Sequence, residues 1–278
     1  YYYAYAEYTQ RNYETALEGF LKVKDHPEYK NFVPYYIVQI YYHQQRYEEV
    51  IPMAESLILQ NKKNQNNVEI YRILGECYYQ KKDYQQTITY FNEYHSSVKR
   101  VVRNDMYLLG ISYFNVGNYQ ESITYLSKVT TQNDPIAQNA HLYLGHSYLH
   151  LNLKKNARFS FEQAAKLTYD KVVQEEAMYN YALSTYEMSF SPFNESVLVF
   201  EEFLKKFPNS KYTDKIHDYL VNVYLTTNNY DAAYQSMLQI KNPGPRIQEA
   251  KQRVLYSMGV DALIANKYDV AIDFFTKS

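Results

Sequence analysis

The chain has 278 residues, of which 46% are hydrophobic, so it can bury a large core, and a disordered or collagen-like protein is excluded. The formal net charge is −1 and no segment concentrates Lys and Arg, which argues against nucleic acid as a partner. A single cysteine, Cys77, excludes an internal disulfide framework and a cysteine-rich zinc site.

The hydrophobic residues are scattered rather than gathered into long runs. No apolar run approaches the ~20 residues that a membrane-spanning helix needs, so no direct membrane insertion is predicted. Tyrosine is over-used, at 35 residues, and Trp is absent. Because tyrosine joins an apolar ring to a hydroxyl that prefers a wet edge, this composition suits a surface groove.

A helix–turn–helix pattern recurs from one end of the chain to the other. The chain begins in a first helix, Tyr1 to Tyr8, and ends in a second helix, Asp269 to Ser278. The turn position of each copy can be followed, and successive positions lie 34, 37, 35, 35, 39, 37 and 38 residues apart. These positions predict eight helix pairs, and they are Tyr13, Tyr47, Tyr84, Tyr119, Lys154, Phe193, Tyr230 and Tyr268.

Small and aromatic residues recur at fixed places within the copies. A Gly or Ala in the first helix lets the second helix approach closely, and these residues are Ala4, Gly75, Gly110, Gly145, Ala182 and Gly259. Three residues after the turn a small residue recurs, with Val50 as the bulky exception: Ala16, Thr87, Ser122, Ala157, Ser196, Ala233 and Ala271. Four residues later an aromatic ring recurs, at Phe20, Phe91, Phe161, Phe200 and Phe275.

This spacing and signature resemble the tetratricopeptide repeat, a pattern of ~34 residues with W-x2-L-G-x2-Y followed by A-x3-F. The resemblance spans the chain, although the opening Trp is replaced by Tyr71, Met106, His141, Met178 and His217. It implies an all-α fold, a right-handed α–α superhelix, or solenoid, of about eight helix pairs. It also implies one array over residues 1–278, in which each pair buries its apolar face only by stacking on the next.

Two segments depart from the pattern. The segment from Met188 to Asn194 is two residues longer than its counterparts, and Pro192 predicts that the extra length is loop. The segment 241–246 contains a Pro-Gly-Pro turn, which predicts a bend in the array rather than a boundary, because the pattern resumes at Ala250.

The terminal helices lack the polar capping helices that an isolated array needs, so both ends are expected to be cut from a longer chain. The last pair is then predicted to expose Ile272 and Phe275 or their neighbours. We expect homo-oligomerisation through these exposed end helices.

The first helices of such a superhelix line its concave surface, where these solenoids bind their partners. Two rows of positions on that surface are rich in aromatic residues. One interpretation is a groove that binds a peptide or protein partner; the other is that the rings pack on one another across adjacent first helices. The candidate partner-binding residues are Tyr8, Tyr35, Tyr42, Arg72, Tyr79, Tyr107, Phe114, Tyr179, Tyr186 and Tyr256.

Some tetratricopeptide domains hold a C-terminal carboxylate with Lys and Asn from successive first helices. The matching positions of this chain depart from that carboxylate clamp, since they carry Arg72, Glu76 and Gln80, and then Tyr107, Ile111 and Asn115. Paired basic residues are missing from this set, so a chaperone adaptor of the clamp type is not expected.

Candidates for chemistry are few. His146 and His150 lie four residues apart, with His141 one turn earlier, but no H-E-x-x-H arrangement accompanies them, so a metal site is not predicted. Cys77 has no nearby His or basic residue in sequence to activate it and reads as a packed small residue. Without a phosphate-binding or nucleophile motif, the sequence predicts neither a cofactor nor catalysis.

The leading interpretation is a scaffold for protein or peptide partners. The Tyr-rich pairs and the junction from Phe207 to Asp214 resemble long tetratricopeptide proteins of Gram-negative envelopes, which implies a periplasmic or outer-membrane-associated setting and a role in envelope assembly. Two alternatives stay open: a targeting or accessory region of a larger enzyme, and a cytoplasmic peptide-binding regulatory module.

Overall fold

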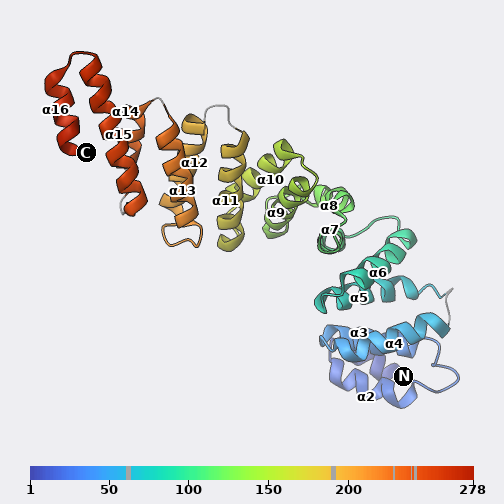
Figure 1. The fold of residues 1–278 in the computed structure, drawn as a ribbon. Helices are drawn as coiled ribbons and strands as arrows, with labels where there is room; N and C mark the ends of the chain where they lie inside the picture. The colour runs from blue at the N-terminus through green and yellow to red at the C-terminus, as the bar shows by residue number, and fades with distance from the viewer. Residues whose placement is uncertain (61–63, 189–191, 228, 239, 241–242) are drawn as a thin grey trace. The chain divides into compact units, whose positions relative to one another are not determined.

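The computed structural model describes residues 1–60, 64–188, 192–227, 229–238, 240 and 243–278, apart from the side chains of 192–195. Within these ranges the chain has sixteen α-helices, one short 3₁₀ helix and no strand (Figure 1). It divides into two compact units, residues 1–132 and 133–278, and each is described by itself. The all-α fold of eight helix pairs is confirmed, whereas the single continuous array and its handedness stay predictions.

Each unit contains four helix pairs. Unit 1 consists of α1 (Tyr2–Thr9), α2 (Tyr13–Val23), α3 (Val33–His43), α4 (Tyr47–Gln60), α5 (Asn67–Gln80), α6 (Tyr84–Ser97), α7 (Arg103–Asn115), α8 (Tyr119–Leu126) and the 3₁₀ helix η1 (Ser127–Val129). Unit 2 consists of α9 (Pro135–His150), α10 (Lys154–Lys166), α11 (Lys171–Met188), α12 (Pro192–Lys206), α13 (Thr213–Thr226), α14 (Tyr230–Leu238), α15 (Pro245–Ile264) and α16 (Tyr268–Lys277).

The predicted turn positions coincide with the starts of the second helices. Seven of the eight are the first residue of an even-numbered helix, and α12 begins one residue before Phe193. Polar residues cap three of these helices: Asp83, Asn118 and Asn229 accept hydrogen bonds from the backbone N–H groups of Gln86, Glu121 and Ala232 at 3.1, 3.3 and 3.2 Å.

The sequence did not predict the left-handed backbone conformation at the centre of the turns. In the six turns that the structure describes completely, the middle residue has φ between 57° and 81°, and only one of these residues is glycine. A non-glycine side chain in this region carries a conformational cost, so packing of the two helices must hold the turn closed. The six residues are Arg11, Gln45, Lys82, Gly117, Asn152 and Asn266.

The two departures from the pattern have different outcomes. Pro192 is the first residue of α12 and Met188 the last of α11, so the prediction that Pro192 keeps the extra length in a loop is wrong. Proline is well accommodated at a first helical position because its missing N–H would have no intrahelical partner there. In the other segment Pro245 likewise begins α15, while residues 241 and 242 lie outside the described residues, and the bend stays a prediction.

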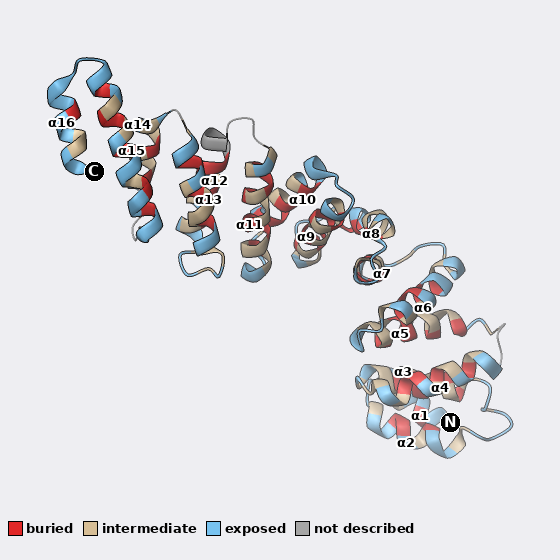
Figure 2. Cartoon of the chain, in the orientation of Figure 1, coloured by how far each residue is buried: buried red, intermediate tan, exposed pale blue. Residues whose placement is uncertain are grey.

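Glycines of the first helices face the large residue of the paired second helix, as predicted. A Cβ atom at Gly75 would lie 2.9 Å from the Phe91 ring, and one at Gly259 would lie 2.6 Å from Phe275. Phe91 and Phe161 are fully buried, and the buried positions follow the contacts between helices (Figure 2). Close packing therefore selects these glycines.

A second set of contacts joins consecutive pairs through side-chain hydroxyls. The hydroxyls of Tyr78 on α5 and Tyr90 on α6 both donate to Glu55 Oε1 on α4, at 2.7 and 2.8 Å. The arrangement recurs in unit 2, where Tyr224 on α13 and Ser236 on α14 donate to Glu201 on α12. Part of the high tyrosine content is thus structural.

Ile272 lies four residues after the turn position of its pair. The equivalent residues Leu17, Ile51 and Val197 are 5%, 9% and 4% exposed, whereas Ile272 is 62% exposed. We expect the chain to associate weakly through this face, so sedimentation should show a concentration-dependent mass that Ile272→Lys abolishes. A wild-type mass that does not depend on concentration would count against the predicted oligomer.

Candidate partner-binding surface

The odd-numbered helices of each unit form what we call its first-helix face. Within unit 1, α3 contacts α5 and α5 contacts α7; within unit 2, α9 contacts α11 and α13 contacts α15. Seven of the ten candidate residues lie on the first helices of unit 1, and three, Tyr179, Tyr186 and Tyr256, lie on those of unit 2. The prediction that these residues belong to first helices is therefore met.

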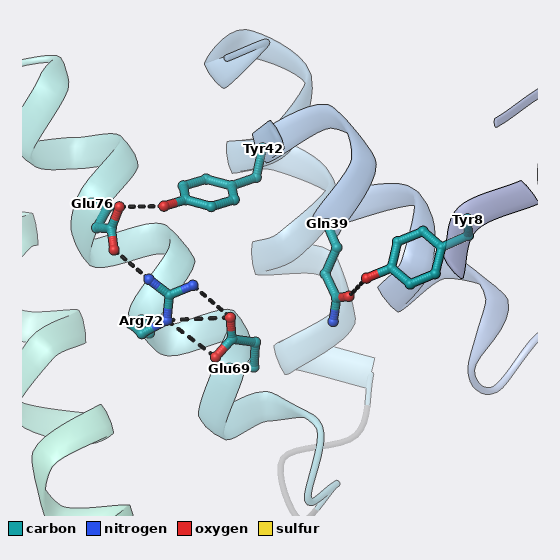
Figure 3. Close-up of polar contacts among 6 residues, drawn as sticks. All are labelled: Tyr8, Gln39, Tyr42, Glu69, Arg72 and Glu76. Atoms are coloured by element: carbon teal, nitrogen blue, oxygen red, sulfur yellow. Dashed lines mark hydrogen bonds and ion pairs between the residues drawn. The ribbon is translucent and has the colours of Figure 1, made fainter. Parts of the chain in front are cut away.

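Three tyrosines of unit 1 hydrogen-bond to the next first helix. The Tyr8 hydroxyl donates to Gln39 Oε1, and the Tyr42 hydroxyl donates to Glu76 Oε2 (Figure 3). Tyr35 is only 5% exposed and donates to Asn67 Oδ1 at 3.1 Å. Burial and the hydrogen bond to the Glu76 carboxylate raise the pKa of Tyr42 to about 12, so this hydroxyl remains a donor at neutral pH.

Arg72 lies between two carboxylates of its own helix. Its guanidinium contacts Glu69 Oε1 at 2.6 Å, pairs with Glu76 Oε1, and lies 5.6 Å from the Tyr42 ring centroid (Figure 3). Burial disfavours its charge, but the hydrogen bonds to Glu69 and the charge of Glu76 outweigh this effect and raise the pKa of Arg72. Arg72 is thus held by its neighbours and does not project as a free cation.

The remaining candidates of unit 1 are half-buried rings. Tyr79 packs edge-on against Tyr84 with centroids 6.0 Å apart, and Phe114 packs in the same way against Tyr119 at 5.6 Å. Tyr107 packs beside the core cluster that contains Leu108. Each ring keeps part of its surface accessible.

The candidates of unit 2 differ from one another in exposure. Tyr179 is 9% exposed and stacks on Tyr212 with centroids 4.1 Å apart, whereas Tyr256 is 59% exposed. Tyr186 packs against Tyr219 at 5.1 Å. Tyr35 and Tyr179 therefore serve packing between helices, which leaves six candidates on the first helices of unit 1 and two, Tyr186 and Tyr256, on those of unit 2.

A cavity of about 200 Å³ lies at the C-terminal ends of α3 and α5. The sequence does not predict this cavity, because only one of its lining residues, Tyr42, belongs to the ten candidate residues. A larger cavity of about 600 Å³ lies at the N-terminal end of α3 and the C-terminal end of α4, and its lining residues include the candidate Tyr35. The smaller cavity is lined by Tyr42, His43, Gln45, Tyr47, Glu76 and Gln80.

The histidines and the cysteine considered for chemistry lie in different surroundings. His146 Nε2 lies 3.1 Å from Glu176 Oε1, and the buried Nδ1 of His141 has no partner among the described residues. No group of three His, Cys, Asp or Glu side chains that could hold a metal ion occurs in the described ranges. Cys77 is fully buried, and this burial raises the pKa of its thiol to about 12, so it is protonated at neutral pH.

Comparison with known families supports the repeat assignment. Residues 107–171 match the tetratricopeptide repeat model, and residues 43–129 match the model for the anaphase-promoting complex, cyclosome, subunit 3. The eight helix pairs supply the matching architecture. Residues 107–171 are thus similar to the tetratricopeptide repeat. Comparison with the curated proteins gave no significant match.

Several solved structures share the fold of this chain. The C-terminal part of a TPR repeat-containing protein from Cytophaga hutchinsonii has a TM-score of 0.56 at 17% identity, over 89% of this chain and 98% of that one. YrrB, described as a TPR protein with an unusual peptide-binding site, has a TM-score of 0.56 at 13% identity, over 72% of this chain and 99% of its own. MamA of AMB-1 reaches 0.51 at 17% identity, over 59% and 87%.

The repeats indicate a scaffold for protein–protein interaction. Among the helices that the structure describes, none combines the length and the apolar character that a membrane span requires.

Proposed function

We propose that this chain is a non-catalytic scaffold whose first-helix face in unit 1 binds an extended segment of a protein partner. The observation that supports this most is a row of four half-buried rings, one from each first helix: Tyr8, Tyr42, Tyr79 and Phe114. Each ring has the same register in its repeat, so a segment that crosses the helices meets one ring after another.

The row is suited to binding because its geometry is fixed in advance. The hydroxyls of Tyr8 and Tyr42 are hydrogen-bonded to the next helix, and the rings of Tyr79 and Phe114 rest on the aromatic residue that follows their turn. Because these rings are already held in place, binding of a partner would cost little further side-chain conformational entropy in the protein. Half-buried aromatic rings are also the residue type that contributes most to interfaces.

The peptide-binding site named for YrrB supports the class of ligand, since that protein has the same fold. An envelope setting is proposed on the junction from Phe207 to Asp214 alone. Sequencing upstream of Tyr1 tests that setting, because a leader peptide would support it and a leaderless start would support the cytoplasmic alternative.

Truncation of one ring of the row tests the proposed surface. A peptide would first be selected on the full chain from a library of random peptides. Phe114→Ala should then weaken its binding about tenfold, because one aromatic contact of the row is lost. Calorimetric titration of purified variants measures the change.

Phe159→Ala is the matched control, since Phe159 is 59% exposed on α10, outside the first helices. It should leave the affinity unchanged, and thermal melts of both variants exclude unfolding as the cause. Equal affinities of wild type and Phe114→Ala for every selected peptide would move the binding surface elsewhere.

A further inference from the structure

The cavity between α3 and α5 has room for one side chain. Its volume of about 200 Å³ is below the range of pockets that hold whole small ligands. Two tyrosine rings, Tyr42 and Tyr47, contribute to its walls, and Glu76 is the charged side chain among its lining residues. The chemistry of this wall therefore decides which side chain of a bound segment fits.

The Glu76 carboxylate can accept further hydrogen bonds. One oxygen pairs with Arg72 and the other accepts from the Tyr42 hydroxyl, whereas a carboxylate offers about four acceptor positions. Arg72 is shared between Glu76 and Glu69, so this group of three side chains carries a net negative charge. The site can thus accept a cation without displacing its own contacts.

Two other basic groups near the cavity are already paired with carboxylates, whereas Arg11 acts on His43. Arg46 pairs with Glu49 at 2.8 Å, and Lys81 pairs with Glu48 at 2.9 Å. Burial lowers the pKa of His43, and the nearby charges of Arg72 and Arg11 lower it further, so His43 is neutral at pH 7.

The backbone adds to the same preference. Tyr42 and His43 belong to the last turn of α3, and Gln80 is the last residue of α5. Helix C-termini carry a partial negative charge that favours cations, and the faces of tyrosine rings attract them as well.

The carboxylate, the C-terminal ends of α3 and α5 and the ring faces favour a cation, and only the N-terminal end of α4 at Tyr47 opposes it. We infer that the cavity lined by Tyr42, Tyr47, Glu76 and Gln80 receives a Lys or Arg side chain of the bound protein segment, an inference that rests on the proposed function. The preference is opposite to that of a carboxylate clamp, which would need cations at these positions. Segments with a basic residue bind, and acidic segments are rejected.

The inference is tested by exchanging the charge on both sides of the contact. Peptides selected on the full chain from a library of random peptides should be enriched in Lys or Arg at one position. Replacing that residue with norleucine keeps the aliphatic stem and should weaken binding to wild type about tenfold, the effect of losing a charge-assisted hydrogen bond. Glu76→Gln should bind the basic peptide about tenfold more weakly and should no longer distinguish it from the norleucine peptide.

Glu18→Gln removes the same charge from an exposed position on α2 and should keep the discrimination, which excludes a general effect of net charge. The inference is overturned if selected peptides lack basic residues, or if norleucine has the same effect in wild type and in Glu76→Gln. Selection of no peptide at all would instead refute the proposed function, so the two failures are distinguishable. Thermal melts confirm that Glu76→Gln is folded.

Discussion

Phe161→Ala is expected to lower the free energy of unfolding by about 4 kcal/mol, in the range measured for buried Phe to Ala changes. The ring is fully buried on α10, directly against Gly145 of α9, where a Cβ atom could not be accommodated. Its removal leaves a cavity that Gly145 has no side chain to fill. Chemical denaturation, fitted with a model that allows repeats to unfold separately, measures the loss.

Phe159→Ala supplies the control from the same helix. Phe159 is 59% exposed, so the same chemical change should cost less than about 1 kcal/mol. Gly145→Val alone should also destabilise the protein, by about 2 kcal/mol, since it overpacks the contact with Phe161. Combined with Phe161→Ala it should cost less than the sum of the two single changes. Strict additivity would show that the glycine and the ring do not share one contact.

The repeat framework could be predicted from the sequence because its causes are local and recur. A first helix cannot approach its partner unless a small residue lies at the contact, so Gly75, Gly110 and Gly145 marked the same position in three copies. The turn residue begins seven of the eight second helices because the turn between paired helices has a fixed length. Such features need no knowledge of neighbouring repeats.

Which candidate side chains are buried and which stay accessible depends on neighbouring repeats, and this could not be predicted from the sequence. Tyr35 and Tyr42 lie on one helix, yet Tyr35 is buried against Asn67 while Tyr42 lines a cavity with Glu76. The difference arises from side chains about 32 to 34 residues away. A hydrogen-bond partner at that distance has no signature in a single repeat, and the same holds for Glu55, which binds two tyrosines of the next pair.

Asp105→Asn is expected to stabilise the protein by about 2 kcal/mol at pH 7 and to destabilise it by about 1 kcal/mol below about pH 4. Asp105 is 2% exposed on α7, and its Oδ2 has no hydrogen-bond partner among the described residues. Burial, reinforced by the charges of Glu76 and Glu69, raises its pKa from 3.8 to about 6, although Arg72 and Tyr94 oppose the change. The difference between these pKa values corresponds to about 3 kcal/mol, and the unpaired amide of Asn reduces the gain.

The direction with pH follows from proton binding. Between about pH 4 and pH 6 the folded chain holds the Asp105 proton that the unfolded chain has lost, so the stability of the wild type falls as pH rises through this window. Above about pH 6 the full cost of the buried charge is present. Subtracting the wild-type curve from that of Asp105→Asn cancels the contribution of other groups, and the difference should rise by about 3 kcal/mol to a plateau across this window.

Asn118→Ser is the control for this experiment, because Ser replaces Asn as the N-cap of α8 about equally well and the change involves no titratable group. Its stability difference from wild type should not depend on pH. A flat difference for Asp105→Asn as well would mean that the buried carboxyl keeps an ordinary pKa, and that water or a side chain satisfies Oδ2. A plateau reached near pH 6 would instead show that α7 packs against its neighbours around an uncompensated carboxyl, so mild acid strengthens this contact within unit 1.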